Sequence, residues 1–274
     1  MTTPRVSVLM PVLNPHPVYF AQAVRSVLEQ SMSDLELVIV EDPSPVDGKA
    51  LLANISDPRL RHIQNPVRTS LVDQRNRTLA EARADVVAML DADDIALPDR
   101  LAKQLAFLDT HPHIDVLGSQ LFIIDEQGAQ IGLRSYPLAH HDIIATMSRY
   151  NAMAQPSSMC RKAALDAVGG YQYRRFPVNE DYDLWSRLAK HGAQFANHPE
   201  PLLRYRVHPM GSKAMLLHQM LRATLDVKRE FWRDQMDTWS VLRFYGERVL
   251  LRLPATWVLK LFMLTQYVPG DRRS

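Results

Sequence analysis

Three aspartates follow an apolar run within the segment Val86–Arg100, at positions Asp91, Asp93 and Asp94. The β-branched and aliphatic residues before them predict a buried strand. Carboxylates crowded at a strand end repel one another and lose hydration, and a divalent cation is the simplest compensation. Carboxylate oxygens suit Mg²⁺ or Mn²⁺, which commonly share their coordination shell with substrate phosphates. The pattern indicates a metal–diphosphate site; the alternative is a solvated acidic turn in which Asp94 or Asp99 serves the next helix N-terminus.

Two earlier apolar runs also end in polar residues. Val6–Val12 is followed by Asn14, and Leu35–Val40 is followed by Asp42. In an open α/β sheet, ligands bind outside the carboxyl ends of the strands, so all these groups would face one crevice. The sequence contains no Gly-x-Gly-x-x-Gly and no Gly-x4-Gly-Lys-Ser/Thr motif, so phosphates need another holder. A metal ion is the economical candidate.

Strand-like and helix-like segments alternate through the first half of the chain, which predicts a parallel sheet covered on both faces. We expect strands over Val6–Val12, Leu35–Val40, Leu60–Ile63 and Val86–Leu90. We expect helices around Phe20–Leu28, Gly48–Ile55, Ser70–Arg83 and Leu101–Leu108, with Pro98 in the first turn of the last one.

The second half is less regular. Strands are expected over Asp115–Ile124, Pro156–Cys160 and Leu202–Val207, and after the turn at Glu126-Gln127-Gly128. Helices are expected over Ala163–Val168 and Asp181–His191, each stopped by glycine, and over most of the chain from Lys213 onward.

Composition excludes several classes of protein. The chain has 274 residues, enough for one large α/β domain or a domain with an appendage. A net charge of +2 offers no argument for nucleic-acid binding. The single cysteine, Cys160, excludes an intramolecular disulfide and a Cys-x-x-Cys site, and we expect it to be a buried small hydrophobe. Strand-like sequence begins by Arg5, so we expect no signal peptide and a cytoplasmic protein.

Five motifs in order resemble those of family 2 glycosyltransferases with a GT-A fold. They are Val6-Ser-Val-Leu-Met-Pro-Val-Leu-Asn14, Val38-Ile-Val-Glu-Asp42, Arg75-Asn76, Leu90-Asp-Ala-Asp-Asp94 and Asn179-Glu-Asp-Tyr-Asp-Leu-Trp185. The resemblance covers about the first 210 residues. It implies a Rossmann-like, mixed but mostly parallel sheet flanked by helices, with a helical C-terminal extension. The implied division is a catalytic domain over 1–210, with nucleotide-binding and acceptor-binding halves over 1–110 and 111–210, and an extension over 211–274.

The resemblance also implies roles for individual residues. The nucleotide pocket would be formed by Pro11, Asn14, Asp42, Arg75 and Asp91. The metal, Mn²⁺ or Mg²⁺, would be bound by Asp93 with His208, and Asp181 would be the catalytic base. The alternative for Glu180-Asp181 is a pair of acids stabilised in the first turn of a helix. The alternative for His208 is a surface histidine, and Trp185 is either a core residue or a sugar-stacking wall.

These roles together imply a metal-dependent inverting transferase of the hexosyltransferase type. It would move one sugar from a nucleoside-diphosphate sugar, first of all a UDP-sugar, to a hydroxyl of a glycan or lipid-linked acceptor. Surface polysaccharide, lipopolysaccharide or glycan assembly is the expected setting. One alternative is a sugar-nucleotide nucleotidyltransferase, which would need a glycine-rich basic loop where Pro11–Pro17 stands. The other is a catalytically silent module that binds sugar nucleotides or glycans.

The segment 249–268 has two interpretations. Its aliphatic and aromatic residues, flanked by basic ones, are typical of a helix at the inner face of a membrane that brings the enzyme to a lipid-linked acceptor. They are also typical of a helix that packs on the catalytic domain or on another subunit of a homo-oligomer, and we favour packing. No run of 18 apolar residues predicts a membrane-spanning helix.

Overall fold

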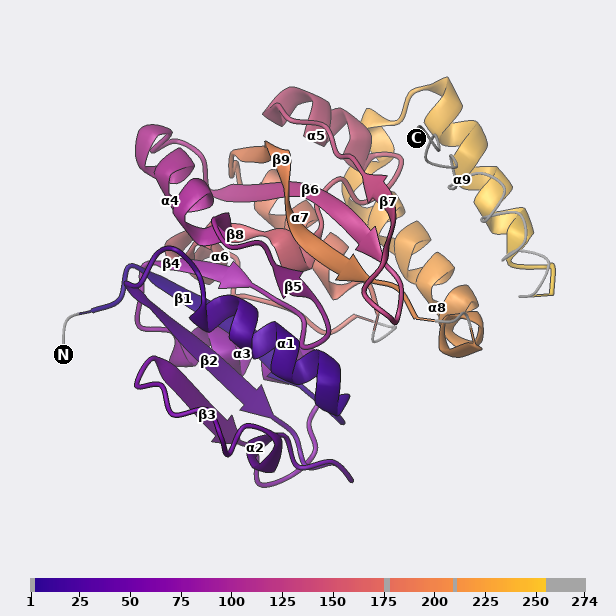
Figure 1. The fold of residues 1–274 in the computed structure, drawn as a ribbon. Coiled ribbons are helices and arrows are strands. Elements are labelled where there is room, and N and C mark those ends of the chain that lie inside the picture. The colour runs from indigo at the N-terminus through magenta and orange to yellow at the C-terminus, as the bar shows by residue number, and fades with distance from the viewer. Residues whose placement is uncertain (1–2, 175–177, 209–210, 255–274) are drawn as a thin grey trace, which may run out of the picture.

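A computed structural model describes residues 3–174, 178–208 and 211–254. In this part of the chain, nine strands form one sheet in the order β3-β2-β1-β4-β8-β6-β9-β5, and β7 pairs with β6 (Figure 1). The strands are β1 (Val6–Val12), β2 (Leu35–Glu41), β3 (Leu60–Gln64), β4 (Val86–Met89), β5 (Ile95–Ala96), β6 (Val116–Ile124), β7 (Gln130–Arg134), β8 (Met159–Arg161) and β9 (Phe195–Arg206).

Helices cover both faces of this sheet. The helices of the described residues are α1 (Pro17–Leu28), α2 (Gly48–Leu51), α3 (Leu71–Glu81), α4 (Arg100–Thr110), α5 (His140–Met147), α6 (Lys162–Ala167), α7 (Glu180–Lys190), α8 (Gly211–Val227) and α9 (Thr238–Leu250). Short 3-10 or π turns are η1 (Gln155–Ser157), η2 (Lys228–Trp232) and η3 (Arg233–Gln235).

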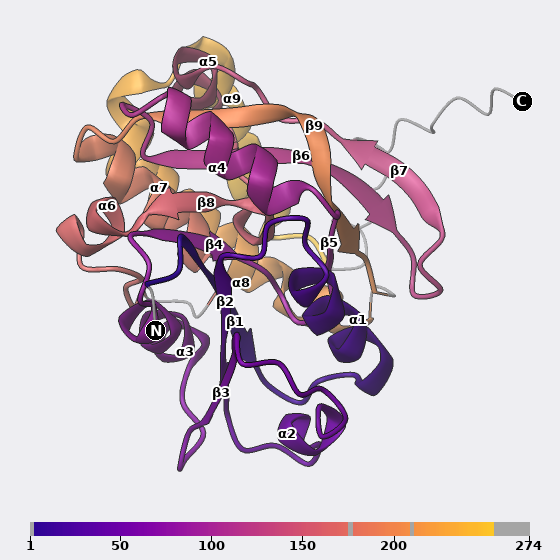
Figure 2. The same cartoon turned by 60° about the vertical axis from the view of Figure 1, so that its left-hand side comes forward.

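The sheet is mixed, as the resemblance implied. β1 pairs in parallel with β2 and β4, and β2 pairs in parallel with β3, which confirms the parallel sheet predicted for the first half. Further along, β8 runs antiparallel to both β4 and β6, and β7 runs antiparallel to β6. β6 and β9 return to a parallel pairing, and these two strands lie side by side with β7 in Figure 2. The predicted α/β class with a GT-A-like mixed sheet is confirmed.

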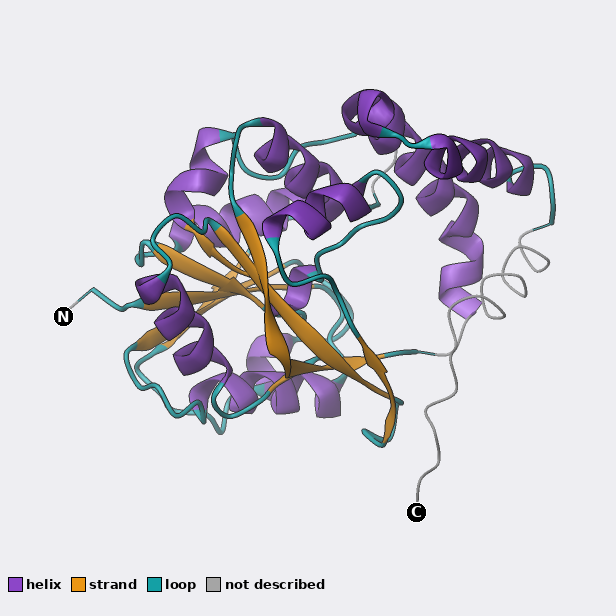
Figure 3. Ribbon diagram, turned by 90° about the horizontal axis from the view of Figure 1, so that it is seen from above, coloured by secondary structure: helices purple, strands orange, loops and turns teal. Residues whose placement is uncertain are grey.

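Two apolar cores lie on opposite faces of the sheet, where Figure 3 shows helices above and below the strands. One core joins Phe20 and Val24 of α1 and Leu105 of α4 to inward side chains of β1 and β2. The other joins α3, α6 and α7 to the opposite side chains, with Trp185 fully buried at its centre. Strands with both faces covered read as continuous apolar runs. That is why β1 and β2 were predicted with nearly correct ends.

Elements with weaker apolar patterns differ from the prediction. α2 ends at Leu51 rather than near Ile55, and β9 starts at Phe195, well before the expected Leu202. α4 begins at Arg100, so Pro98 lies in the preceding turn and not in the first helical turn. Strand β5 has two residues and helix α5 has eight, and neither was predicted. The polar residues and proline within β9 hide its strand character.

The C-terminal helices are fastened to the sheet domain by side-chain contacts. Trp232 Nε1 of η2 donates a hydrogen bond to Ser186 Oγ of α7 at 2.8 Å. Arg149 pairs with Asp237, the residue that caps α9, at 2.6 Å. The predicted boundary at residue 210 stays a prediction. Of segment 249–268, only residues 249–254 are described, and no described helix is long and apolar enough to span a membrane.

Candidate active site

Arg75 joins two acidic parts of the predicted site. It lies in α3 with a side chain that is 9% exposed. Its Nε donates to Glu180 Oε1 at 3.0 Å, and a terminal nitrogen lies 3.6 Å from Asp91 Oδ1. α3 is positioned by a capping box in which Ser70 and Asp73 exchange hydrogen bonds at its N-terminus. The structure therefore brings the aspartate after β4 and the acidic start of α7 to one place.

Asp181 stands next to this junction. Its Oδ2 accepts a hydrogen bond from Asn151 Nδ2 at 2.9 Å, and its Oδ1 accepts from the backbone N–H of Tyr182. Burial, followed by the charge of Glu180, raises the pKa of Asp181 to about 7. A carboxyl that titrates near neutrality can accept a proton from a hydroxyl and return it to solvent at physiological pH. The arrangement therefore suits a general base.

The residue before this acidic pair has an unusual backbone. Asn179 lies in the left-handed region, with φ of 60°, which asparagine tolerates better than most residues. Its Nδ2 donates to the carbonyl of Met220 at 2.9 Å and to Thr224 Oγ1 at 2.7 Å. Both acceptors belong to α8, so the C-terminal extension holds the start of α7.

Asp93 and His208 meet although 115 residues separate them in sequence. Their Oδ2 and Nε2 atoms lie 2.6 Å apart, and both side chains are about one third exposed, at 37% and 36%. β9 delivers His208, because Arg206 at its end bonds through its backbone N–H to Asp94 Oδ1 at 2.8 Å. A carboxylate and an imidazole aimed at one point, beside solvent, are a suitable pair of ligands for a divalent cation.

Asp94 has a different environment from its neighbours. It is fully buried, and its Oδ2 has no hydrogen-bond partner among the described residues. Burial, followed by the charges of Asp93 and Asp91, raises its pKa well above the usual value. The alternative in which the side chain of Asp94 or Asp99 caps the following helix is not observed, since Asp94 accepts from Arg206 and Asp99 makes no side-chain capping bond to α4.

Asp42 is buried within a hydrogen-bonded cluster. Its two oxygens accept from Asn65 Nδ2 at 2.5 Å, from the backbone N–H of Thr69 at 2.6 Å and from Thr69 Oγ1 at 3.0 Å. Arg77 in turn donates to Asn65. A cavity next to the cluster is lined by residues 41–44, 46–47 and 64–65. The base of a bound nucleotide would have to share this carboxylate with Asn65 and Thr69. The nucleotide-binding role of Asp42 therefore stays a prediction.

Asn14 and Pro11 lie at the end of β1. Asn14 is exposed, has a left-handed backbone with φ of 50°, and donates through its N–H to Ser44 Oγ at 3.1 Å. Pro11 is half-buried in register with Val40 of β2. The structure thus brings Asn14 to the loop after Asp42, while no described contact joins it to Asp91 or Asp181.

Two alternatives from the sequence are resolved by burial. Trp185 of α7 is fully buried in the core. The interpretation that it forms a wall for stacking sugars is therefore wrong. Cys160 is fully buried as predicted, and burial raises the pKa of its thiol to about 12.

Sequence reasoning missed the supporting residues of the site. Glu180 was seen only as Asp181's neighbour, although it binds Arg75. Asn151 lies in an irregular segment with no pattern to mark it. Thr69 donates to Asp42 through its backbone N–H and its hydroxyl, and no pattern in the sequence marks this contact.

The residues fit a metal site in which the protein supplies only two of the ligands. Among the described residues, no three or more His, Cys, Asp and Glu side chains are grouped so as to hold a metal by themselves. The pair Asp93–His208 supplies two ligands of the types that Mn²⁺ accepts. Mg²⁺ and Mn²⁺ sites of this kind take their remaining ligands from water and substrate phosphates. Asp93 and His208 would therefore complete the coordination of a metal ion only together with water and a phosphate-bearing substrate.

Comparison with known proteins identifies the family. The sequence profile described as "Glycosyl transferase family 2" matches residues 7–182, which is more than half of the chain. The chain belongs to this family. It is 34% identical over 209 residues to the putative glycosyltransferase EpsE of Bacillus subtilis, covering 74% of this chain and 73% of that protein. It is 27% identical to the Escherichia coli O-antigen biosynthesis glycosyltransferase WbnJ, covering 85% and 91%.

Solved structures share the fold. The mannosyltransferase PcManGT of Pyrobaculum calidifontis, in complex with GDP-Man and Mn²⁺, matches 97% of this chain and 82% of its own, with a TM-score of 0.63 and 17% identity. TarS 1–349 of S. aureus, in complex with UDP-GlcNAc, matches 81% and 66%, with a TM-score of 0.61 and 20% identity. The chain covers 39% of a longer TarS chain.

Proposed function

We propose that the chain transfers a single sugar from a nucleoside-diphosphate sugar to a hydroxyl acceptor, with inversion at the anomeric carbon. The donor that we favour is a UDP-sugar. The observation that carries this proposal is the pair of contacts of Arg75 with Asp91 and Glu180. These contacts hold Asp91 near Glu180, the neighbour of Asp181, which supports a site in which donor-binding groups and a base lie together.

The positions of the side chains support the following reaction. An oxygen of Asp181 takes the proton of the acceptor hydroxyl while that hydroxyl oxygen bonds to the anomeric carbon. The bond from the anomeric carbon to the diphosphate oxygen breaks on the opposite face, and the nucleoside diphosphate leaves with the electron pair. Asp93 and His208 would hold Mn²⁺ or Mg²⁺, whose charge stabilises the leaving diphosphate. Arg75 and Asp91 orient the donor.

The setting follows from the relatives. WbnJ is named for O-antigen biosynthesis and AmsE of Erwinia amylovora for amylovoran biosynthesis. We therefore expect a glycan or lipid-linked precursor of a surface polysaccharide as the acceptor, at the cytoplasmic face of a membrane. Family membership disfavours the nucleotidyltransferase alternative, and the presence of Asp93, His208 and Asp181 disfavours a silent binding module.

Thermal shift with nucleoside diphosphates and their sugars tests the donor and the metal together. Ligand that binds the native state raises the melting temperature by mass action. We expect one nucleotide to give a shift with Mn²⁺ that disappears with EDTA and in Asp93→Ala. Asp99→Ala is the matched control, because Asp99 is an exposed aspartate of the same segment with no capping bond. A shift that survives in Asp93→Ala would contradict the proposed ligand.

Release of the nucleoside diphosphate then separates an enzyme from a silent module. The wild type should release it from the donor that gives the shift, and faster once the correct acceptor is added. Donor binding without release under any condition would support the silent module instead.

A further inference from the structure

A groove rich in arginine lies between α8 and α9, on the extension, and its lining includes neither Asp181 nor Asp93. Its cavity volume is about 720 Å³. Arg222, Arg229, Arg233 and Arg248 line it, and Asp226 is the one acid that the described residues contribute. Its floor includes apolar side chains such as Leu225 and Phe244. The groove therefore combines positive charge with apolar surface.

The charge of this groove is poorly neutralised. Arg222, Arg233 and Arg248 form no ion pair with any described residue, and Arg229 has only a long contact of 3.4 Å with Asp226. Nearby cations outside the groove are paired, as Lys228 is with Glu247 at 2.7 Å. Four guanidinium groups around one cavity repel one another unless an anion lies between them. Guanidinium groups bind phosphate especially well.

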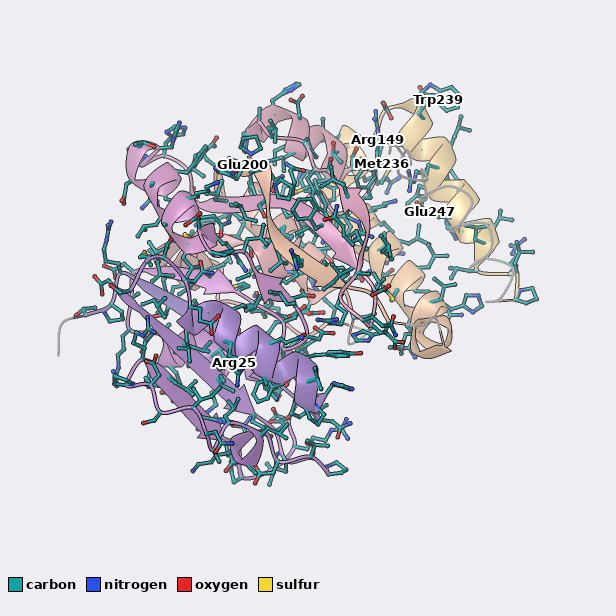
Figure 4. The ribbon with its side chains drawn as sticks, in the orientation of Figure 1. Arg25, Arg149, Glu200, Met236, Trp239 and Glu247 are labelled. Carbon is teal, nitrogen blue, oxygen red and sulfur yellow. The ribbon has the colours of Figure 1, made fainter. Side chains whose placement is uncertain are left out.

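An exposed apolar stripe continues from the groove along α9. Val241, Tyr245 and Val249 recur every four residues and are 38%, 58% and 57% exposed, and Leu242 beside them is 58% exposed. Val241 and Tyr245 also line the groove, so the groove and the stripe form one surface. Trp239, 77% exposed, stands at the outer start of α9 in Figure 4.

We propose that this surface docks onto an anionic phospholipid bilayer. The groove arginines bind lipid phosphates, and the stripe enters the boundary between headgroups and acyl chains. Tyr245 and Trp239 are of the types enriched at membrane interfaces. Docking does not depend on the proposed sugar transfer, since it uses none of the residues assigned to donor or base.

Other occupants fit the charge less well. A second copy of the chain would bring its own four arginines against these four. The remaining chain, residues 255–274, carries Lys260, Arg272 and Arg273 but only one acidic side chain, Asp271, so it adds no net negative charge. An anionic membrane is the occupant that complements both the charge and the apolar stripe.

Flotation of the full chain with lipid vesicles tests the proposal. We expect binding to vesicles of phosphatidylcholine mixed with phosphatidylglycerol, little binding to phosphatidylcholine alone, and weakening with added salt. The variant Arg222→Gln/Arg233→Gln/Arg248→Gln should bind at least about tenfold more weakly, since each basic side chain near an anionic surface contributes to binding. These arginines have no ion pair in the described structure to lose, so the fold should remain intact.

A charge-matched control separates this site from net charge. It removes three exposed arginines elsewhere, in Arg5→Gln/Arg25→Gln/Arg83→Gln, and Arg25 lies on α1, far from α8 and α9 in Figure 4. This control should bind vesicles nearly as the wild type does. Equal losses in the two triple variants would overturn the proposal, because net charge alone would then explain binding.

The apolar stripe has its own pair of variants. Leu242→Ser/Val249→Ser should weaken vesicle binding, whereas Val18→Ser/Leu133→Ser, at exposed apolar positions of α1 and β7, should not. Each variant must keep the wild-type melting temperature and its shift with donor nucleotide. A wild type that does not bind anionic vesicles, or that forms a dimer lost in Leu242→Ser/Val249→Ser, would overturn the proposal. The donor shift reports separately on the proposed sugar transfer.

Discussion

At the scale of single residues, the site is a group of acidic side chains, of which some contact a positively charged or imidazole side chain and others do not. Arg75 contacts Glu180 and Asp91, and His208 contacts Asp93. Asp181 contacts an amide and a backbone N–H but no described cation. An acid that is buried without a cation keeps its proton to higher pH. Asp181 and the buried Asp94 both lack a cation in direct contact, and burial raises the pKa of both.

Asp181→Asn removes the proton acceptor with little change of shape. We expect transfer to fall about 10²-fold or more, the usual contribution of a general base, while the donor still produces its thermal shift. Asp166→Asn, at an exposed surface pair with Lys162, is the control and should transfer normally. Initial rates of nucleoside diphosphate release with acceptor make the comparison. Near-normal transfer by Asp181→Asn would place the base elsewhere.

The pH dependence should follow the same carboxyl. Only the deprotonated form of Asp181 accepts a proton, and its pKa is about 7. The value of kcat/KM for the donor, which reports on the free enzyme, should rise about tenfold per pH unit below 7 and level off above it. Stability should change in the opposite direction: a raised pKa means that ionisation is disfavoured in the folded state, so stability falls as pH rises from 3.8 through 7. Asp181→Asn should lose that pH dependence, which thermal melts between pH 5 and 8 would show.

At the scale of elements, the site depends on the start of α7. The left-handed Asn179 turns the chain into this helix, and α8 holds its side chain. The Glu180-Asp181 pair and the helix that follows it are readable from the sequence. This fastening is not readable from it, because Met220 and Thr224 are 40 or more residues away and polar contacts leave no periodic pattern. Likewise β1 and β2 were readable from buried apolar runs, whereas β5 is formed by pairing with β9 alone.

Thr224→Val tests this fastening with an isosteric change. It removes the acceptor at 2.7 Å from Asn179 but leaves the bond to Met220. One hydrogen bond contributes about 1 kcal/mol, so we expect kcat to fall about fivefold with KM for the donor unchanged. The midpoint of the pH profile should also move, which a merely structural role would not cause. Thr224→Ser keeps the hydroxyl and should restore both. Wild-type kcat in Thr224→Val would show that α8 does not position Asp181.

At the scale of the whole molecule, the extension and the sheet domain share buried polar contacts. Trp232 of the extension donates to Ser186 of α7, and within the extension the nearly buried pair Lys228–Glu247 joins η2 to α9. Glu247 also accepts from Arg243. Contacts of this kind make separate unfolding of the extension unfavourable. We therefore expect a single thermal transition for the described structure.

Lys228→Met breaks an ion pair inside the extension and tests whether its loss destabilises the whole described structure or the extension alone. It leaves Glu247 buried with only Arg243 as partner, and breaking a buried pair costs about 3 kcal/mol. We expect one unfolding transition at lower urea concentration. Adding Glu247→Leu should recover part of the loss, because no buried charge is then left unpaired. Two separate transitions in the wild type would show instead that the extension folds independently.

The meeting of Asp93 and His208 has a consequence for the order of folding. Asp93 follows an early strand, but His208 arrives only after β9 has inserted between β6 and β5. Contacts between residues so far apart in sequence form late, since a long loop must first close. We therefore expect the pair to be absent from partly folded chains, so that a metal does not nucleate folding. During refolding, metal-dependent donor binding should return in the last kinetic phase, after the β1–β4 half has regained its structure.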